Sequence, residues 1–206
     1  MSKVHYHFDH VGSYLRPQAL KEAREKFADG DISQDELLKV QDELVKDLVH
    51  HEVENGLQVV SDGEFGRSWW HLDFLWNLTG FEAYQQEASY KFHGAKTRTT
   101  NVRINGKIAE NPNHPFYRDF EYLKSVTPEG ITPKVTIPSP SLIINRDHRS
   151  DFYADYYDSW TDFLDDLAKA YHDTIQHFYD LGARYVQLDD TTWGYLIQQF
   201  ENEKNN

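Results

Sequence analysis

Two carboxylates follow a short apolar run near residue 60. The run, Leu57 to Val60, is preceded by Gly56 and followed by a polar, glycine-rich segment that reaches Arg67. This pattern is typical of a buried parallel strand that ends at the rim of an active site. Asp62 and Glu64 come just past the apolar residues, where an α/β barrel places its chemistry. The alternative is a solvated turn.

A second pair of acids, Asp189 and Asp190, closes another short apolar run, Tyr185 to Leu188. If both runs are parallel strands, their carboxyl ends face the same rim. Glu64 and Asp189 could then act as the acid and the nucleophile of a glycosidase, with tryptophan side chains stacking on the sugar. This hypothesis predicts carboxyl groups ~5–10 Å apart.

Near the N-terminus the sequence matches HxHxDH, a metal-binding signature of metallo-β-lactamase-like hydrolases. Its members are His5, His7, Asp9 and His10. Alternate histidines on a strand point the same way and can share one zinc ion. The alternative is a histidine cluster exposed at the rim, because the sheet that precedes this motif in those hydrolases and their second ligand segment are absent from the sequence.

The composition excludes several classes of function. The chain of 206 residues has a formal net charge of −13, which argues against a nucleic-acid partner because such a surface needs a basic face. It has no apolar run long enough to span a bilayer and no signal-peptide core, so we expect a cytoplasmic protein without a membrane partner. The absence of Cys excludes disulfides and thiolate metal sites within this chain.

Helical periodicity and capping signals predict the elements that position these residues. Ser33 and Glu36 form a predicted capping box, and Ser150 is a predicted helix cap. The expected helices are Gln18 to Ala28, a helix from Ser33 to Glu54, a short aromatic helix after Trp69, Phe116 to Val126, Asp151 to Leu181, and Trp193 to Phe200. We expect five strands, near Tyr6, Val59, Val102, Val135 and Val186.

Alternating strands and helices predict an α/β fold with a parallel sheet, of the (β/α)8 TIM-barrel type. A complete barrel usually needs ~250 residues. We therefore expect residues 1–206 to form a single incomplete barrel domain, truncated after about five β/α units. An incomplete barrel leaves a sheet edge open, so self-association or a complementing chain is a further expectation.

Five segments together resemble the cobalamin-independent methionine synthase family, specifically its carboxyl-terminal catalytic barrel and its short stand-alone relatives of the YxjG type. The resemblance covers the amino-terminal part of that barrel. The segments are HVGSYLRP from His10, SDGEFGRSWW from Ser61, VR at Val102, VTIPSPS from Val135 and VQLDD from Val186.

The resemblance implies methyl transfer to the thiol of homocysteine, a step of methionine biosynthesis. It implies that Val11, Gly12 and Ser13 hold the carboxylate of the amino acid through their backbone. It also implies that Glu64 and Asp189 bind the ammonium group. Such a pairing suits an α-amino acid, which presents one anion and one cation.

The resemblance further implies a methyl-folate as the candidate methyl donor, with Arg103 at its site. Lys96, Arg98 and Lys107 surround Arg103 in the densest basic segment of the chain. The family's zinc is held by one His, two Cys and a Glu. Since this chain has no Cys, we expect neither the zinc ligands nor a complete catalytic apparatus within it, and we expect it to be inactive alone.

Overall fold

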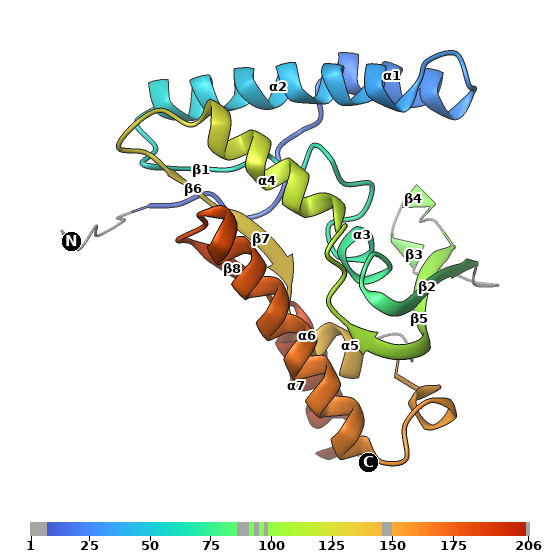
Figure 1. The fold of residues 1–206 in the computed structure, drawn as a ribbon. Coiled ribbons are helices and arrows are strands. Elements are labelled where there is room, and N and C mark those ends of the chain that lie inside the picture. Colours follow the sequence, from blue (N-terminus) through green and yellow to red (C-terminus); the bar gives the residue numbers. More distant parts are fainter. Residues whose placement is uncertain (1–7, 86–90, 93–94, 97–98, 146–149, 205–206) are drawn as a thin grey trace. The chain divides into compact units, whose positions relative to one another are not determined.

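The computed structural model describes residues 8–85, 91–92, 95–96, 99–145 and 150–204 (Figure 1). The chain divides into two compact units. Unit 1 comprises Met1–Trp70, Pro115–Val135 and Phe178–Gln187, and unit 2 comprises His71–His114, Thr136–His177 and Leu188–Asn206. None of the helices within the described ranges is long and apolar enough to cross a membrane.

Three helices of unit 1 were predicted with nearly their observed bounds. They are α1 (Gln18–Ala28), α2 (Gln34–Glu54) and α4 (Pro115–Val126). The predicted capping box is confirmed, since the Glu36 N–H donates to Ser33 Oγ at 3.3 Å and the Ser33 N–H donates to Glu36 Oε2 at 2.8 Å. Local sequence signals are therefore sufficient to define where α2 begins.

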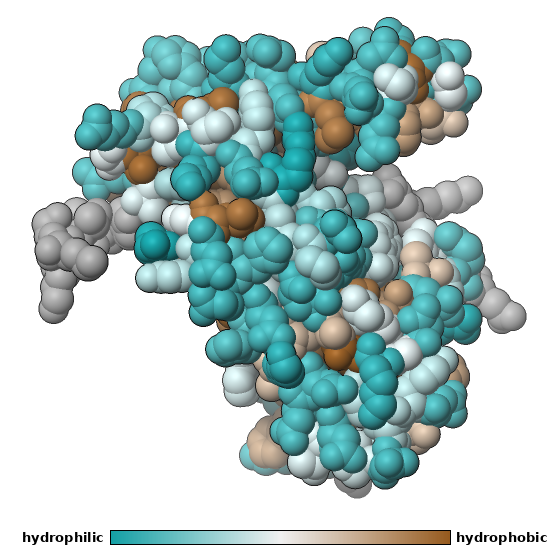
Figure 2. All heavy atoms as spheres, in the orientation of Figure 1, coloured by the Kyte–Doolittle hydropathy of each residue, from teal (hydrophilic) through white to brown (hydrophobic). Residues whose placement is uncertain are grey.

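The core of unit 1 lies under α1, α2 and α4. Its buried members are Leu20, Val45, Val49, Val60, Phe65 and Leu123. On α2 the buried stripe also contains two polar residues, Gln41 and Glu52. Figure 2 shows that the visible surface over α2 is mainly hydrophilic, with apolar residues in small separate patches, as expected for an amphipathic helix.

Strands predicted near Val59, Val135 and Val186 are confirmed. In unit 1, β1 (Val59–Val60) pairs in parallel with β6 (Thr132–Pro133). The strand β7 (Val135–Pro138) pairs with β8 (Val186–Asp189). Val135 N–H donates to the carbonyl of Tyr185 and Ser139 N–H to that of Asp189, so partner numbers rise together, as in a parallel pair. The strand predicted near Tyr6 falls outside the described residues.

The strand predicted near Val102 exists, but the prediction that it belongs to a parallel sheet is wrong. In unit 2, β5 (Thr100–Ala109) pairs antiparallel with β2 (Thr79–Gln85), a strand that is not among the five expected from the sequence. Phe81, Val102 and Ile104 are buried while alternate residues are more exposed, which is typical of an antiparallel hairpin with one covered face. A second short hairpin joins β3 (Lys91–Phe92) to β4 (Ala95–Lys96).

The long helix predicted from Asp151 begins later. After α3 (Leu72–Leu75), α5 (Ser141–Ile144) and a 3-10 turn at Tyr153–Asp155, α6 runs over Trp160–Leu181, and α7 spans Thr192–Lys204. Ser159 caps α6, because its hydroxyl accepts from the Asp162 N–H at 3.1 Å. Ser150, the predicted cap, instead donates to the Ile144 carbonyl at 3.4 Å.

The α/β class is confirmed. Across the described residues the strands form four two-stranded sheets and no closed barrel, and the truncation of a (β/α)8 barrel after about five β/α units remains a prediction.

Candidate functional site

The acidic turn after β1 adopts a backbone conformation that L-residues rarely adopt. Phe65 N–H donates to the Asp62 carbonyl at 3.2 Å, and the two residues between them, Gly63 and Glu64, have φ angles of 64° and 59°. For Glu64 this left-handed conformation costs ~1–3 kcal/mol, a kind of strain that concentrates at functional sites. Asp62 compensates in part, since its Oδ1 accepts from the Glu64 N–H at 2.9 Å.

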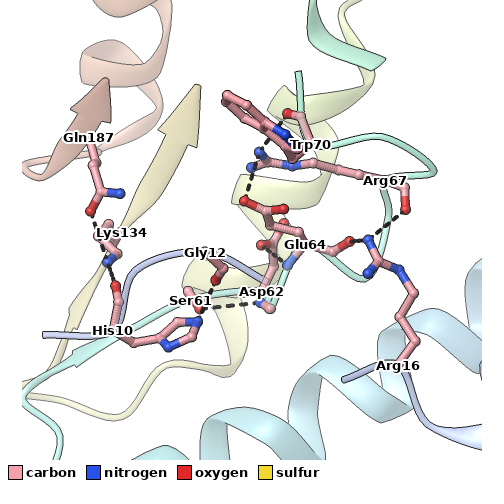
Figure 3. A network of polar contacts seen from close by, with 11 residues as sticks. His10, Gly12, Arg16, Ser61, Asp62, Glu64, Arg67, Trp70, Lys134 and Gln187 are labelled. Carbon is pink, nitrogen blue, oxygen red and sulfur yellow. Dashed lines mark hydrogen bonds and ion pairs between the residues drawn. The ribbon is translucent and has the colours of Figure 1, made fainter. Parts of the chain in front are cut away.

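Three arginines fix the shape of this turn, and Figure 3 shows two of them, Arg16 and Arg67. Arg16 donates to the carbonyls of Glu64 and Arg67 at 3.1 and 3.0 Å. Arg24 donates to the carbonyl of Arg67 at 3.0 Å. The guanidinium of Arg67 is buried, lies 4.4 Å from the centre of the Phe116 ring, and is 3.4 Å from Oε1 of Glu64. The Glu64 carboxylate is thus buried next to a cation.

The predicted carboxylate-binding turn lies beside the acidic turn in unit 1. Val11, Gly12 and Ser13 are exposed, and Gly12 has a φ of 86°. Within the part of the chain that the structure describes, their N–H groups make no hydrogen bond. The next residue, Tyr14, donates its N–H to the carbonyl of Gly63 at 3.2 Å. The structure therefore brings together the predicted residues Val11, Gly12, Ser13 and Glu64.

A buried lysine holds the segment that leads into the predicted carboxylate-binding turn. Lys134 Nζ donates to Asp9 Oδ1 at 3.0 Å, to Gln187 Oε1 at 3.2 Å and to the carbonyl of His10. The Tyr185 hydroxyl donates to the other Asp9 oxygen at 2.7 Å. Burial raises the pKa of Asp9, but the hydrogen bonds from Tyr185 and Lys134 outweigh it and leave that pKa below its usual value.

These contacts bear on the metal-hydrolase hypothesis. Both carboxylate oxygens of Asp9 are engaged by Tyr185 and Lys134. His5 and His7 lie outside the described residues. Among the residues that are described, no three His, Cys, Asp or Glu side chains form a group able to hold a metal ion.

A buried glutamate, Glu52 of α2, contacts residues next to both turns. Its Oε2 accepts from the Ser61 N–H at 3.1 Å and its Oε1 from the Ser61 hydroxyl at 3.3 Å. The Tyr14 hydroxyl is a further hydrogen-bond partner. Burial raises the pKa of Glu52 to about 7, and the charge of Asp62 adds to that rise against the effect of the hydrogen bonds.

Asp189 lies in unit 2, at the end of β8. It is half-buried, and its carbonyl accepts from the Ser139 N–H at 2.7 Å. Its neighbour Asp190 belongs to a hydroxyl-rich network, accepting from Ser139 Oγ at 3.2 Å and from the Thr192 N–H at 2.8 Å. Ser141 and Thr192 share a hydrogen bond of 2.9 Å.

Arg103, the predicted donor-binding residue, also lies in unit 2. Both its Nε and its Nη2 contact Glu82 Oε1 at 2.7 Å across the hairpin. The side chain is partly exposed, and its guanidinium lies 5.3 Å from the centre of the Tyr84 ring. Its charge is therefore compensated on the hairpin itself. Of its predicted basic neighbours, Arg98 lies outside the described residues.

The donor set of this chain does not fit the zinc that the resemblance implies. That zinc needs two thiolates, and the 206-residue sequence has no Cys. Two thiolate ligands would have to come from another segment or chain.

Sequence reasoning missed several residues that build the site. Arg16, Arg24, Glu52, Arg67 and Lys134 each contact the turns or the segment next to them. A signal existed for Glu52, because it continues the buried stripe of Gln41, Val45 and Val49 along α2. No local signal marks Lys134, whose partners are more than fifty residues away in sequence.

Comparisons with known proteins relate this chain to one family. Residues 9–203 match the model of the cobalamin-independent synthase catalytic domain. Two uncharacterized proteins of Bacillus subtilis, YxjH and YxjG, are each 38% identical over 95% and 96% of this chain. A methionine synthase of Sulfolobus acidocaldarius is 29% identical over 87% of it. The chain spans about half the length of these relatives, 50% to 51%.

Solved structures show the same relationship. The putative vitamin-B12 independent methionine synthase from Listeria monocytogenes superposes with a TM-score of 0.75 at 40% identity, covering 93% of this chain and 54% of that one. A B12-independent methionine synthase from Shewanella in complex with selenomethionine, at 18% identity and a TM-score of 0.55, covers 77% of this chain and 44% of that one and supports the fold alone. On this evidence the chain belongs to the cobalamin-independent methionine synthase family, within its catalytic domain.

Proposed function

We propose that unit 1 supplies the amino-acid half-site of a methyltransferase that acts on homocysteine or a similar thiol amino acid. The observation that carries the proposal is the juxtaposition of two turns. An exposed turn at Val11–Ser13 offers backbone N–H donors, and a strained turn places the buried carboxylate of Glu64 beside it, with the Tyr14 N–H bonded to Gly63 O at 3.2 Å.

The two turns match the charges of an α-amino acid. Backbone N–H groups in a glycine turn stabilise a carboxylate, and a buried carboxylate stabilises an ammonium group through a charge-assisted hydrogen bond. The anchored Glu64 needs little reorganisation on binding, because Arg16 and Arg24 already fix the turn. Asp189 is the proposed second acid for the ammonium group.

The complete reaction is part of the proposal as well. The thiol of the bound amino acid would receive a methyl group, with a methyl-folate as candidate donor and Arg103 as a donor-binding residue. Because the chain carries no thiolate ligands, catalysis would depend on zinc ligands from another segment or chain. We propose that residues 1–206 bind the amino acid but do not turn it over alone. No observation favours the hydrolase alternatives, and the family assignment disfavours both.

Binding is the direct test. Isothermal titration of the chain with L-methionine and L-homocysteine should give saturable binding, with weaker binding of D-methionine. Glu64→Gln should weaken binding of L-methionine about tenfold or more, because one charge-assisted hydrogen bond is worth ~1.5–3 kcal/mol. The analogue 3-(methylthio)propionate, which lacks the amino group, should bind the wild type and the variant equally.

The matched control is Glu129→Gln, an exposed carboxylate of the same unit, which should leave binding unchanged. The half-site would be refuted by a wild-type chain that does not bind L-methionine. A Glu64→Gln variant that binds L-methionine as tightly as the wild type would refute the role of Glu64.

A further inference from the structure

The side chain of Glu52 links the two proposed substrate turns, although Glu52 itself belongs to helix α2 and to neither turn. It is on α2, nine residues before Ser61, and only 3% of its side chain is exposed. Its two carboxylate oxygens accept from the Ser61 N–H and the Ser61 hydroxyl at 3.1 and 3.3 Å, and the Tyr14 hydroxyl is hydrogen-bonded to it.

Each of these partners directly adjoins one of the two turns. Ser61 directly precedes the acidic turn, and its hydroxyl also accepts from the Gly63 N–H at 3.2 Å. Tyr14 directly follows the Val11–Ser13 turn and donates its N–H to the carbonyl of Gly63 at 3.2 Å. Glu52, Ser61, Gly63 and Tyr14 therefore form a closed ring of hydrogen bonds, with Glu52 as its only member on a helix.

We propose that Glu52 is a positioning residue that sets the carboxylate-binding turn against the ammonium-binding turn. It acts through Ser61 and Tyr14. The proposal deepens the amino-acid site proposed above and rests on it for the identity of the ligand.

The chemistry of a carboxylate suits this role. An ionised carboxylate only accepts, at about four lone-pair positions, so one Glu can serve an N–H and two hydroxyls at once. A glutamine has the same shape but one acceptor oxygen, and its NH₂ group would face donors. Glu52→Gln therefore disturbs the ring without creating a cavity.

The ionised form of Glu52 is the one that accepts all three hydrogen bonds. The titratable groups that face it are Tyr14 and Asp62, and Asp62 in turn acts on Asp119 of α4. Since burial and Asp62 raise the pKa of Glu52 to about 7, the ring is best formed above neutral pH. The experiment is therefore done at pH 8.

The test compares the wild-type chain with Glu52→Gln and with Glu43→Gln, an exposed position on the same helix. Hydrogen exchange followed by NMR reports the protection of the Tyr14 amide, and isothermal titration reports the affinity for L-methionine. We expect Glu52→Gln to reduce the hydrogen-exchange protection of the Tyr14 amide and to weaken the binding of L-methionine about tenfold. Protection within α1 and α4 should stay as in the wild type, and Glu43→Gln should change neither readout.

Three results would overturn the proposal. The first is a Glu52→Gln variant with unchanged Tyr14 protection. The second is reduced Tyr14 protection with unchanged affinity. The third is a loss of protection spread evenly over α1 and α4, which would make Glu52 an ordinary core residue. If the wild type does not bind L-methionine, the proposed function fails, and Tyr14 protection still decides whether Glu52 holds the turns.

A second variant covers the case in which Glu52→Gln does not fold. Tyr14→Phe removes one hydroxyl from the ring and leaves Glu52 and Ser61 in place. We expect the residue-14 amide to be less protected than in the wild type, while the protection of the Ser61 amide stays at its wild-type level. If the protection of both amides were unchanged from the wild type, the proposal would be overturned.

Discussion

At the scale of single residues, unit 1 buries charged groups and compensates each one nearby. Lys134 is satisfied by Asp9 and Gln187, and Arg67 lies against Glu64 and Phe116. Removing one partner of such a buried pair leaves an uncompensated charge, which is far more costly than the pair itself. Glu52 differs, because its buried carboxylate is hydrogen-bonded to neutral donors and, within the described part of the chain, is not paired with a cation. Its pKa is therefore raised to about 7, so that its charge changes near neutral pH.

The free energy of unfolding of the chain should depend on pH because of Glu52. Its pKa is about 7 in the folded state against a usual 4.5. Between these values the folded chain keeps a proton that the unfolded chain has lost, so the free energy of unfolding falls as pH rises from 4.5 to 7. At ~1.4 kcal/mol per pKa unit the loss is at most about 3 kcal/mol.

Urea unfolding at a series of pH values checks this expectation. The difference between the wild type and Glu52→Gln should decrease through this window and level off above it. Asp119, whose pKa burial raises to about 6, acts in the same direction but is present in both proteins, so it cancels. Parallel pH profiles for the two proteins would contradict the assignment.

At the scale of elements, one irregular hairpin, formed by β2 and β5, depends on a glycine for its strand register. In unit 2 the register of β2 against β5 shifts between Thr79 and Phe81. Gly80 stands at this shift with a φ of 85°, and a Cβ on it would lie 2.4 Å from the carbonyl oxygen of Lys107. Because that oxygen belongs to the backbone, it cannot move aside, and only glycine fits.

Two glycines of the same hairpin offer a matched pair of substitutions. Gly80→Ala should destabilise the chain by ~2 kcal/mol or more, since it adds backbone strain to a steric clash. Gly106→Ala should cost less, because its Cβ would meet only Gly80 Cα, at 3.7 Å, and its φ is not left-handed. Urea unfolding of both variants measures the difference, and equal stability of the two would show that the register shift does not depend on Gly80.

At the scale of the whole molecule, the chain belongs to a family defined by a catalytic domain. It matches that domain over residues 9–203 while covering about half of its relatives' length. The proposed amino-acid half-site lies within one compact unit, and zinc-binding thiolates are absent from the sequence. Self-association and a complementing chain remain predictions at this scale.

The side chains available as metal ligands predict how much zinc the chain binds. We expect the purified chain to hold far less than stoichiometric zinc after dialysis, measured by elemental mass spectrometry, because thiolates are missing. Stoichiometric zinc that is lost on His7→Ala would contradict this expectation. It would instead support a site built from His5, His7, Asp9 and His10.

The sequence by itself determined the features that depend on near neighbours. Helical periodicity and the Ser33–Glu36 box predicted α2, apolar runs predicted β1, β7 and β8, and five segments together, among them the one around Glu64, predicted the family. These features rest on contacts within a few residues, which a linear pattern records.

Only the tertiary structure decided which distant groups meet. It paired β5 with β2 instead of placing it in a parallel sheet, and it brought Lys134 to Asp9. It also turned Glu52, one of two polar residues in the buried stripe of α2, into the hydrogen-bond partner of residues next to both proposed substrate turns. The physical reason is that a buried polar group must find its hydrogen-bond partners wherever the chain brings them, at any separation in sequence.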